Sequence, residues 1–91
     1  MLTINSNLNI PAHVLFTEVD QTAVLLNTQT NQYFSLDEVG ARFWELLKNK
    51  SLLPEIYKTL LNEYEVIPTK LEQDILELVK HLNDNGLVEI T

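Results

Sequence analysis

Apolar and polar positions alternate with a period of two in the first part of the chain. Residues 13–19, HVLFTEV, alternate and are followed by Asp20-Gln21, and residues 22–26, TAVLL, are β-branched and apolar. A polar cluster, NTQTN, then precedes residues 32–36, QYFSL. Alternation bounded by turn residues is typical of strands. The sequence therefore predicts three antiparallel strands, at residues 13–19, 22–26 and 32–36.

From Asp37 onward the apolar positions recur about every 3.6 residues, which is the period of a helix. A first helix is predicted from Asp37 to about Asn49. A second helix is predicted with Ser51 as its N-cap, and Pro54 is tolerated in its first turn because N–H groups there have no intrahelical partner. The residues expected to face the core are Val39, Phe43, Leu46 and Leu47 beside Trp44 in the first helix, and Leu53, Ile56, Leu60 and Tyr64 in the second.

The third predicted helix has the clearest pattern. Thr69 and Glu72 have the spacing of a capping box at its start, and Asn85-Gly86 is a typical C-terminal stop because glycine adopts the left-handed conformation easily. Residues 87–90 are expected either to form a short strand or to pack back on the domain. Leu71, Ile75, Leu78 and Leu82 form its predicted core face, and Leu76 and Val79 add a second apolar edge that one packing stripe does not require.

This order of three strands and then three helices predicts a single α+β domain of winged-helix size. The chain has 91 residues, 45% of them hydrophobic, which suits an ordinary folded domain. The domain is assigned to residues 13–91, and residues 1–12 are expected to be an N-terminal extension.

Charge and composition exclude several classes of function. The net charge is −7 and the six basic residues are scattered singly, so we expect no nucleic-acid partner. There is no cysteine, and His13 and His81 have no partners at ligand spacing, so no metal site and no cofactor are predicted. The N-terminus has neither a signal peptide nor a membrane span, which predicts a cytoplasmic protein without a membrane partner.

The stretch Ser35-Leu36-Asp37 allows two interpretations. Acidic carrier proteins attach a phosphopantetheine arm to a serine in an Asp-Ser-Leu setting, but Phe34 precedes this serine, which also follows strand sequence. Alternatively, Asp37, or Ser35 with Glu38, caps the first helix. Gly40 and Ala41 would then let that helix approach the sheet closely. The second interpretation is favoured, and the stretch is expected to be a joint between strand and helix.

The run VLLNTQTNQYFSLDEVGARFWELL, followed by DILELVKHLNDNGLVEI, resembles the pyrroloquinoline quinone biosynthesis protein D family of precursor-peptide recognition elements. The similarity covers about residues 13–90, with Asp37 where the family often has asparagine. The resemblance implies a winged-helix-like fold and a non-catalytic role: the domain would bind the leader segment of a precursor peptide and present that peptide to a modifying enzyme. In this family the leader pairs with the third strand beside the third helix.

The third strand ends a meander, so it should have an edge of unpaired backbone groups, which suits strand addition. Helical geometry and the resemblance together predict a leader-binding site, with Lys80 at its rim and Asp74 at the position of the family's helix-three aspartate. The predicted site residues are Gln32, Tyr33, Phe34, Ser35, Leu36, Asp74, Ile75, Leu76, Val79, Lys80 and Asn83.

The resemblance leaves the modifying enzyme open. It could be a lasso leader peptidase or cyclase, or a radical S-adenosylmethionine enzyme, and the opening IPAHVLF together with the short chain slightly favours the lasso type. The leader is expected to carry apolar or aromatic anchors at alternate positions, and the acidic domain leaves room for a basic residue. Two other functions stay as alternatives: a carrier protein modified at Ser35, and a winged-helix transcription regulator.

Overall fold

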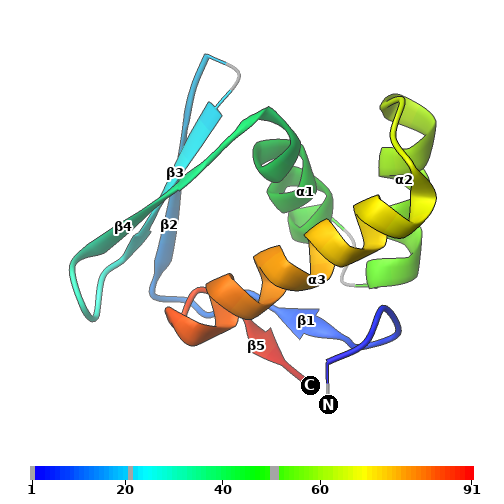
Figure 1. Cartoon of the computed structure of the whole chain (residues 1–91). Coiled ribbons are helices and arrows are strands. Elements are labelled where there is room, and N and C mark those ends of the chain that lie inside the picture. The colour runs from blue at the N-terminus through cyan, green and yellow to red at the C-terminus, as the bar shows by residue number, and fades with distance from the viewer. Residues whose placement is uncertain (1, 21, 50–51) are drawn as a thin grey trace.

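The computed structural model describes residues 2–20, 22–49 and 52–91. These residues form a three-stranded antiparallel sheet followed by three helices, and a two-stranded ribbon joins the two ends of the chain (Figure 1). This is the α+β order predicted from the sequence. The elements are β1 (Leu8–Asn9), β2 (Val14–Val19), β3 (Thr22–Asn27), β4 (Gln32–Leu36), α1 (Glu38–Asn49), α2 (Leu53–Glu63), α3 (Pro68–Asp84) and β5 (Glu89–Ile90).

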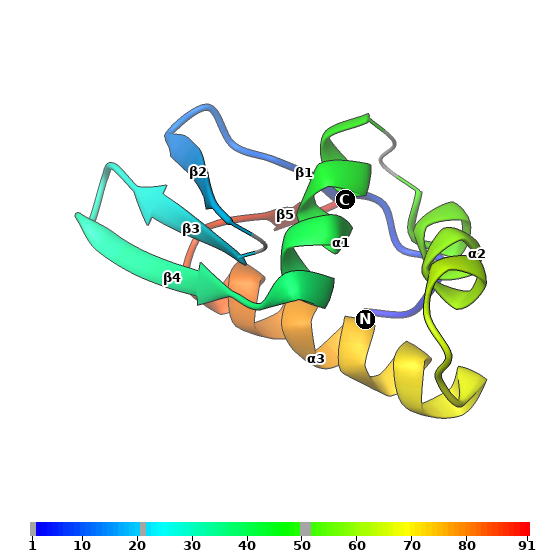
Figure 2. The same cartoon turned by 90° about the horizontal axis from the view of Figure 1, so that it is seen from above.

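The sheet has the order β2-β3-β4, and the helices lie on one of its two sides (Figure 2). Phe16, Leu25 and Phe34 are paired across the three strands, and Leu25 is fully buried on the helix side. Successive strand residues point to opposite faces, so the residues next to these along each strand face away from the helices. Of these, Leu15 is 54% exposed and Tyr33 is 72% exposed. Tyr33 and Phe34 thus point to opposite faces, and Phe34 is partly buried against the core.

The joint between β4 and α1 is held by Asp37. The backbone N–H of Gly40 donates a hydrogen bond to Asp37 Oδ1 over 2.8 Å, so Asp37 is the residue that caps the helix. Such a cap typically stabilises a helix by about 1 kcal/mol. A Cβ atom at Gly40 would lie 3.3 Å from the Leu36 side chain. Glycine therefore allows α1 to start tight against the strand, as the sequence predicted.

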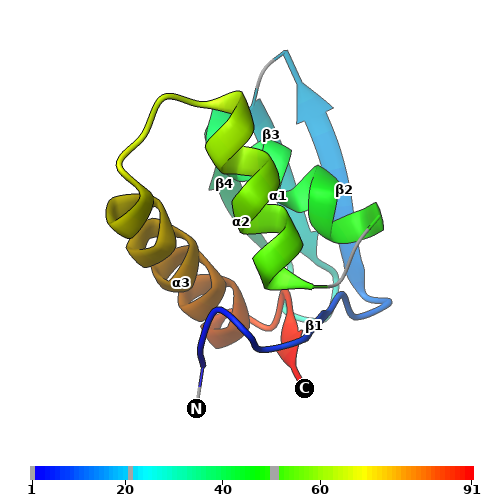
Figure 3. The ribbon, with the colours of Figure 1, turned by 90° about the vertical axis from the view of Figure 1, so that its right-hand side faces the viewer.

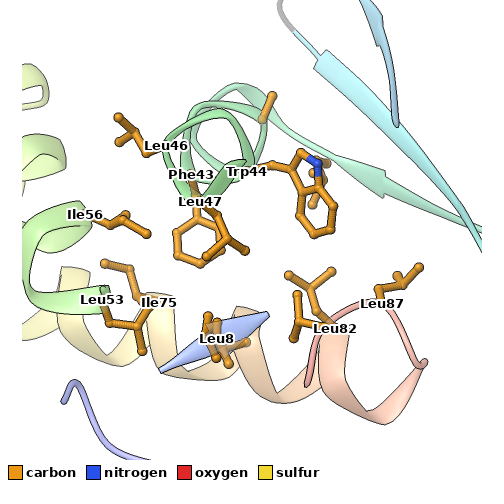
Figure 4. Close-up of a cluster of buried hydrophobic side chains, with 14 of the residues drawn as sticks. Leu8, Phe43, Trp44, Leu46, Leu47, Leu53, Ile56, Ile75, Leu82 and Leu87 are labelled. Carbon is orange, nitrogen blue, oxygen red and sulfur yellow. The ribbon is translucent and has the colours of Figure 1, made fainter. Parts of the chain in front are cut away.

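The core lies between the sheet and the helices (Figure 4). Phe43, Trp44 and Leu47 project into it from α1, and each is at most 4% exposed. Trp44 stacks on Phe16 with ring centroids 6.4 Å apart, and Lys48 Nζ lies 4.9 Å from the centroid of the Phe16 ring. Trp44 is thus a core residue, as predicted. Other elements contribute Leu8, Leu53, Ile56, Leu60, Ile75, Leu82 and Leu87.

The start of α2 agrees with the prediction in the place of its proline, but its N-cap is Leu52. Pro54 lies in the first turn, and no side-chain hydrogen bond caps the helix at Leu52. The predicted N-cap Ser51 lies outside the described residues, as does Gln21 of the predicted first turn. The predicted core residues Leu53, Ile56 and Leu60 are fully buried, while Tyr64 follows the helix and is half-buried.

The start of α3 differs from the prediction. The helix begins at Pro68 and its N-cap is Ile67, which makes no side-chain cap hydrogen bond. The predicted capping box of Thr69 and Glu72 is therefore wrong. Proline is preorganised for the first helical position, so the helix starts two residues earlier than a Thr69 N-cap would allow, and Thr69 falls inside its first turn. The predicted end is confirmed: Gly86 has a φ of 71°.

The buried face of α3 also differs from the prediction. Val79 is fully buried, whereas Leu78 is only half-buried. Both residues continue a helical stripe that starts at Leu71 and Ile75, because spacings of three and of four residues fall on neighbouring positions of one face. The helix is rotated so that Val79 enters the core. Leu78 is left at the surface beside it.

Both ends of the chain meet in the ribbon of β1 and β5 (Figure 3), where Leu8 pairs with Ile90 and Asn9 with Glu89. Leu8 is 3% exposed and belongs to the core. Residues 89–90 therefore form the short strand that was one of two predictions for the C-terminus. The boundary at residue 12 stays a prediction, but part of the segment before it is packed into the fold.

Candidate functional site

β4 is an edge strand. It pairs with β3 from Asn27↔Gln32 to Ala23↔Leu36, and among the described residues it has no strand partner on its other side (Figure 1). In an antiparallel strand, alternate residues turn their N–H and C=O groups toward the one neighbour and the rest turn theirs away from it. The outer edge of β4 thus offers backbone donors and acceptors to a further strand.

A cleft of about 510 Å³ lies next to this edge. One wall is the junction of β4 with α1, and the other is the face of α3 that carries Leu71, Asp74, Ile75 and Leu78. Leu60 of α2 and Val66 also contribute to the lining. The volume is within the range of roughly 300–1,000 Å³ that is typical of ligand sites. The lining residues are Phe34, Ser35, Leu36, Asp37, Val39, Gly40, Phe43, Leu60, Val66, Leu71, Asp74, Ile75 and Leu78.

Most of the cleft lining is apolar, and part of it is open to water. Val39 and Val66 are 36% and 42% exposed, and Phe34 and Leu78 are half-buried. Exposed apolar surface that is gathered in one hollow is a typical feature of binding sites. A ligand with apolar side chains would remove this surface from water.

The charged groups of the lining are carboxylates. Asp37 caps α1, and Asp74 Oδ1 lies 3.4 Å from Lys70 Nζ, with both of these side chains more than half exposed. An exposed pair of this kind adds little stability, with a median of about 0–1 kcal/mol. No Lys, Arg or His is among the lining residues. The cleft therefore suits an apolar ligand and tolerates a positive charge on it better than a negative one.

The end of α2 is tied to α1 by an ion pair. Arg42 donates two hydrogen bonds to Glu63, one of 2.8 Å from Nε and one of 2.6 Å from Nη2. The hydrogen bond from Arg42 lowers the pKa of Glu63, and the same bond raises the pKa of Arg42. Partial burial raises the pKa of Tyr64, and the charge of Glu38 adds to the rise. These contacts hold the α2 side of the cleft in place.

The structure brings together about half of the predicted site residues. Phe34, Ser35, Leu36, Asp74 and Ile75 all line the cleft. Gln32 and Tyr33 belong to the same strand and are exposed, but they lie outside the lining. Their predicted role at the strand edge stays a prediction.

The structure places the other predicted residues of α3 away from the lining: Leu76, Val79, Lys80 and Asn83. The rotation of α3 is the reason. Val79 is enclosed in the core, and the Asn83 side chain donates a 3.0 Å hydrogen bond to the carbonyl of Val88. Lys80 is exposed elsewhere on the helix. They are therefore not part of the cleft lining, and their predicted role in leader binding stays a prediction.

Sequence reasoning missed two α3 residues of the lining. Leu71 and Leu78 were predicted to be core residues, and the structure places both in the cleft wall with Asp74 and Ile75. The positions 71, 74, 75 and 78 follow the i, i+3, i+4, i+7 pattern of one helical face. That pattern was visible in the sequence, but it did not distinguish the cleft side from the core side.

The structure also bears on the carrier, metal and membrane interpretations of the sequence. Ser35 lies inside β4 and not at a helix start, which does not match the carrier interpretation. Within the described part of the chain, no three His, Cys, Asp or Glu residues are grouped as a metal site would require. None of the described helices is long and apolar enough to cross a membrane.

Comparisons with known proteins agree with the predicted family. The sequence model of the family described as coenzyme PQQ synthesis protein D (PqqD) matches residues 22–88. TbiB1 in complex with the TbiA(beta) leader peptide is 34% identical to this chain, with a TM-score of 0.84 over 89% of this chain and 94% of that one. A lasso peptide synthetase B1 complexed with the leader peptide is 26% identical, with a TM-score of 0.81 over 91% and 98%. No curated protein sequence matches the chain.

Proposed function

The chain belongs to the PqqD family, and from that premise we propose that it binds the leader segment of a precursor peptide and delivers that peptide to a modifying enzyme. Binding is the whole of its task in this proposal, and the chemistry belongs to the enzyme. Two proteins of similar structure were solved with leader peptides bound. The cytoplasmic location predicted from the sequence is part of the same proposal.

One observation carries the proposal: the unpaired edge of β4 lies directly beside an apolar cleft. A leader in extended conformation would add a fourth strand along β4 and point every second side chain toward α3. Phe34 and Leu36 of β4 would face its anchors from one side, and Leu78 from the other. The backbone contacts accept any sequence, so the cleft supplies the selectivity.

Stable binding of the leader requires both main-chain hydrogen bonds and buried side chains. About four main-chain hydrogen bonds at roughly 0.5–1.5 kcal/mol each offset only part of the association cost of about 4–15 kcal/mol. Each Leu- or Phe-sized anchor that becomes fully buried adds roughly 1.5–3 kcal/mol. Two or three anchors at alternate positions are therefore needed for stable binding. The acidic domain, with its net charge of −7, also favours a leader that carries a basic residue.

We further propose that the partner enzyme belongs to a lasso-peptide pathway and is a leader peptidase or a cyclase. Support comes from the two similar structures, of which one is described as a lasso peptide synthetase B1. A radical S-adenosylmethionine enzyme is the other candidate, because the family description refers to coenzyme PQQ synthesis. Pull-down of each candidate enzyme with this protein, with and without leader peptide, distinguishes the two.

Titration of a leader peptide tests the binding function. The probe is a synthetic, fluorescently labelled leader encoded by the precursor gene next to this protein's gene, and the readout is fluorescence anisotropy. Saturable binding is expected, and a shuffled peptide of the same composition should bind far more weakly. Equal binding of the two peptides would reject sequence-specific leader recognition.

A backbone N-methyl scan of the same peptide tests the strand-addition mode. Each methyl group removes one N–H donor and leaves the side chain unchanged. In an added strand only alternate N–H groups face β4, so the loss of affinity should alternate with a period of two along the leader. A loss without this period would contradict pairing with β4.

A further inference from the structure

Asn27 has an unusual environment. Among the described residues it is the one polar side chain that is fully buried, at 3% exposure. Both ends of its amide are used: Oδ1 accepts hydrogen bonds from the N–H groups of Gln29, at 2.9 Å, and Thr30, at 3.3 Å, while Nδ2 donates to the carbonyl of Asn85 at 2.9 Å. A buried amide with satisfied partners is a rigid connection.

These bonds join two distant parts of the chain. The Oδ1 contacts hold the turn between β3 and β4, and the Nδ2 contact reaches the residue that follows α3. His13, just before β2, makes a second contact of the same kind, because its Nε2 lies 2.9 Å from the carbonyl of Gly86. The two side chains thus hold consecutive carbonyls at the C-terminal end of α3, which lies beside the base of the sheet in Figure 1.

The position of this connection matters for the cleft. One wall of the cleft is the end of β4 with the start of α1, and the other wall is the stretch of α3 from Leu71 to Leu78. Leu78 is seven residues from Asn85, which is about 10 Å along a helix at 1.5 Å per residue. A helix behaves as a stiff rod over this length, so the point where its C-terminal end is held also affects how far its other half stands from β4.

We propose that Asn27 is a positioning residue for leader recognition: it ties the β3–β4 turn to the end of α3 and thereby sets the separation between the two walls of the cleft. This inference rests on the proposed leader-binding function, since the cleft is the site of that function. Asn27 itself is buried outside the cleft lining, so its effect on binding is exerted through α3.

The substitution Asn27→Asp tests the connection without changing the size of the side chain. A carboxylate can still accept the two N–H groups of the turn, but it cannot donate to the carbonyl of Asn85. The matched control is Thr28→Ala, which removes a 2.8 Å hydrogen bond from Thr28 Oγ1 to the carbonyl of His13 next to the same turn. The backbone N–H of Thr28 still donates to that carbonyl over 2.9 Å, so His13 keeps its place. Both proteins are compared at a temperature where circular dichroism finds them fully folded.

A distance measurement tests the placement of α3 directly and needs no leader. The sequence has no cysteine, so Gln32→Cys in β4 and Glu77→Cys in α3 introduce the only two thiols for spin labels. Both positions are exposed. Asn27→Asp is expected to lengthen or broaden the distance distribution between the labels, and Thr28→Ala to leave it unchanged. A distribution identical to that of the parent protein in the Asn27→Asp variant would overturn the inference.

Leader binding gives the second readout, again with the synthetic leader peptide as the probe. We expect Asn27→Asp to weaken binding about tenfold, since the carboxylate loses the hydrogen bond to the Asn85 carbonyl and repels that oxygen. In a Leu78→Ala background, Asn27→Asp should weaken leader binding by clearly less than tenfold, because α3 no longer presents the Leu78 side chain to the leader. Full additivity of the two changes would contradict an effect through α3. Absence of leader binding by the parent protein would instead reject the proposed function, and the label distances would still test the connection.

Discussion

Leu78 and Val79 are neighbours in the sequence but lie in different environments, and this difference gives a sharp test. Leu78 is half-buried in the wall of the cleft, while Val79 is fully buried in the core. Truncation of each residue to alanine should therefore affect different properties. Leu78→Ala should weaken leader binding, and Val79→Ala should lower stability.

The magnitudes follow from the carbon atoms that are lost. Leu78→Ala removes three carbon groups, worth about 2.4 kcal/mol at roughly 0.8 kcal/mol each if all were transferred from water on binding. Because Leu78 is already half-buried in the free protein, about 1 kcal/mol remains, which is roughly a fivefold increase in Kd. Val79→Ala removes two carbon groups from the core and leaves a cavity, so the free energy of unfolding should fall by about 2 kcal/mol.

Two assays separate these effects. Fluorescence anisotropy with the leader peptide gives Kd, and thermal unfolding followed by circular dichroism gives the melting temperature. Val79→Ala should melt roughly 10 °C lower, since 1 kcal/mol corresponds to about 4–8 °C in a domain of this size, and should bind normally when folded. If Leu78→Ala binds as tightly as the parent protein, or if Val79→Ala loses as much affinity while folded, the assignment of the cleft wall is refuted.

Three further changes have defined outcomes. Gly86→Ala places a side chain at a φ of 71° and should lower the free energy of unfolding by about 1–2 kcal/mol, measured by thermal melts. An unchanged melting temperature would argue against the left-handed turn. Asp37→Ala should lower the free energy of unfolding by about 1 kcal/mol, and Asp37→Asn should leave it almost unchanged, because asparagine also caps helices. Equal losses of stability in the two variants would reject the cap. The hydrogen bond from Arg42 holds the pKa of Glu63 in the folded protein below its ordinary value of 4.5. The pairing therefore stabilises the fold above about pH 4.5, and this stabilisation is lost as the pH falls through the lowered pKa. The melting temperature of Glu63→Gln should fall less between about pH 6 and pH 3 than that of the parent protein, and identical pH profiles would contradict the pairing.

The main elements could be predicted because their signals are local. The change of period at Asp37 separates sheet from helices, and a short polar residue there can cap a helix without knowledge of the rest of the fold. Gly86 stops α3 for a similarly local reason, since its left-handed backbone is strained for other residues. The edge position of β4 followed from its place as the last strand of a meander.

Other features depend on tertiary packing, and the sequence does not determine them alone. Leu78 and Val79 both fit a helical stripe with Leu71, and only the packing of α3 against the rest of the core decides which of them is enclosed. This rotation puts Leu78 in the cleft lining in place of the predicted Val79. The pairing of β1 with β5 was also missed, because two-residue strands are too short to have a recognisable period.

The measurement that tests the central claim most directly is hydrogen exchange of the backbone amides, followed residue by residue in the presence and absence of the leader peptide. Strand addition at β4 predicts that amides on the free edge of Gln32–Leu36 gain protection in an alternating pattern, together with amides of the leader. The other edge strand, β2, should not change. Protection that appears along β2, or binding that leaves every amide of β4 unchanged, would contradict the account.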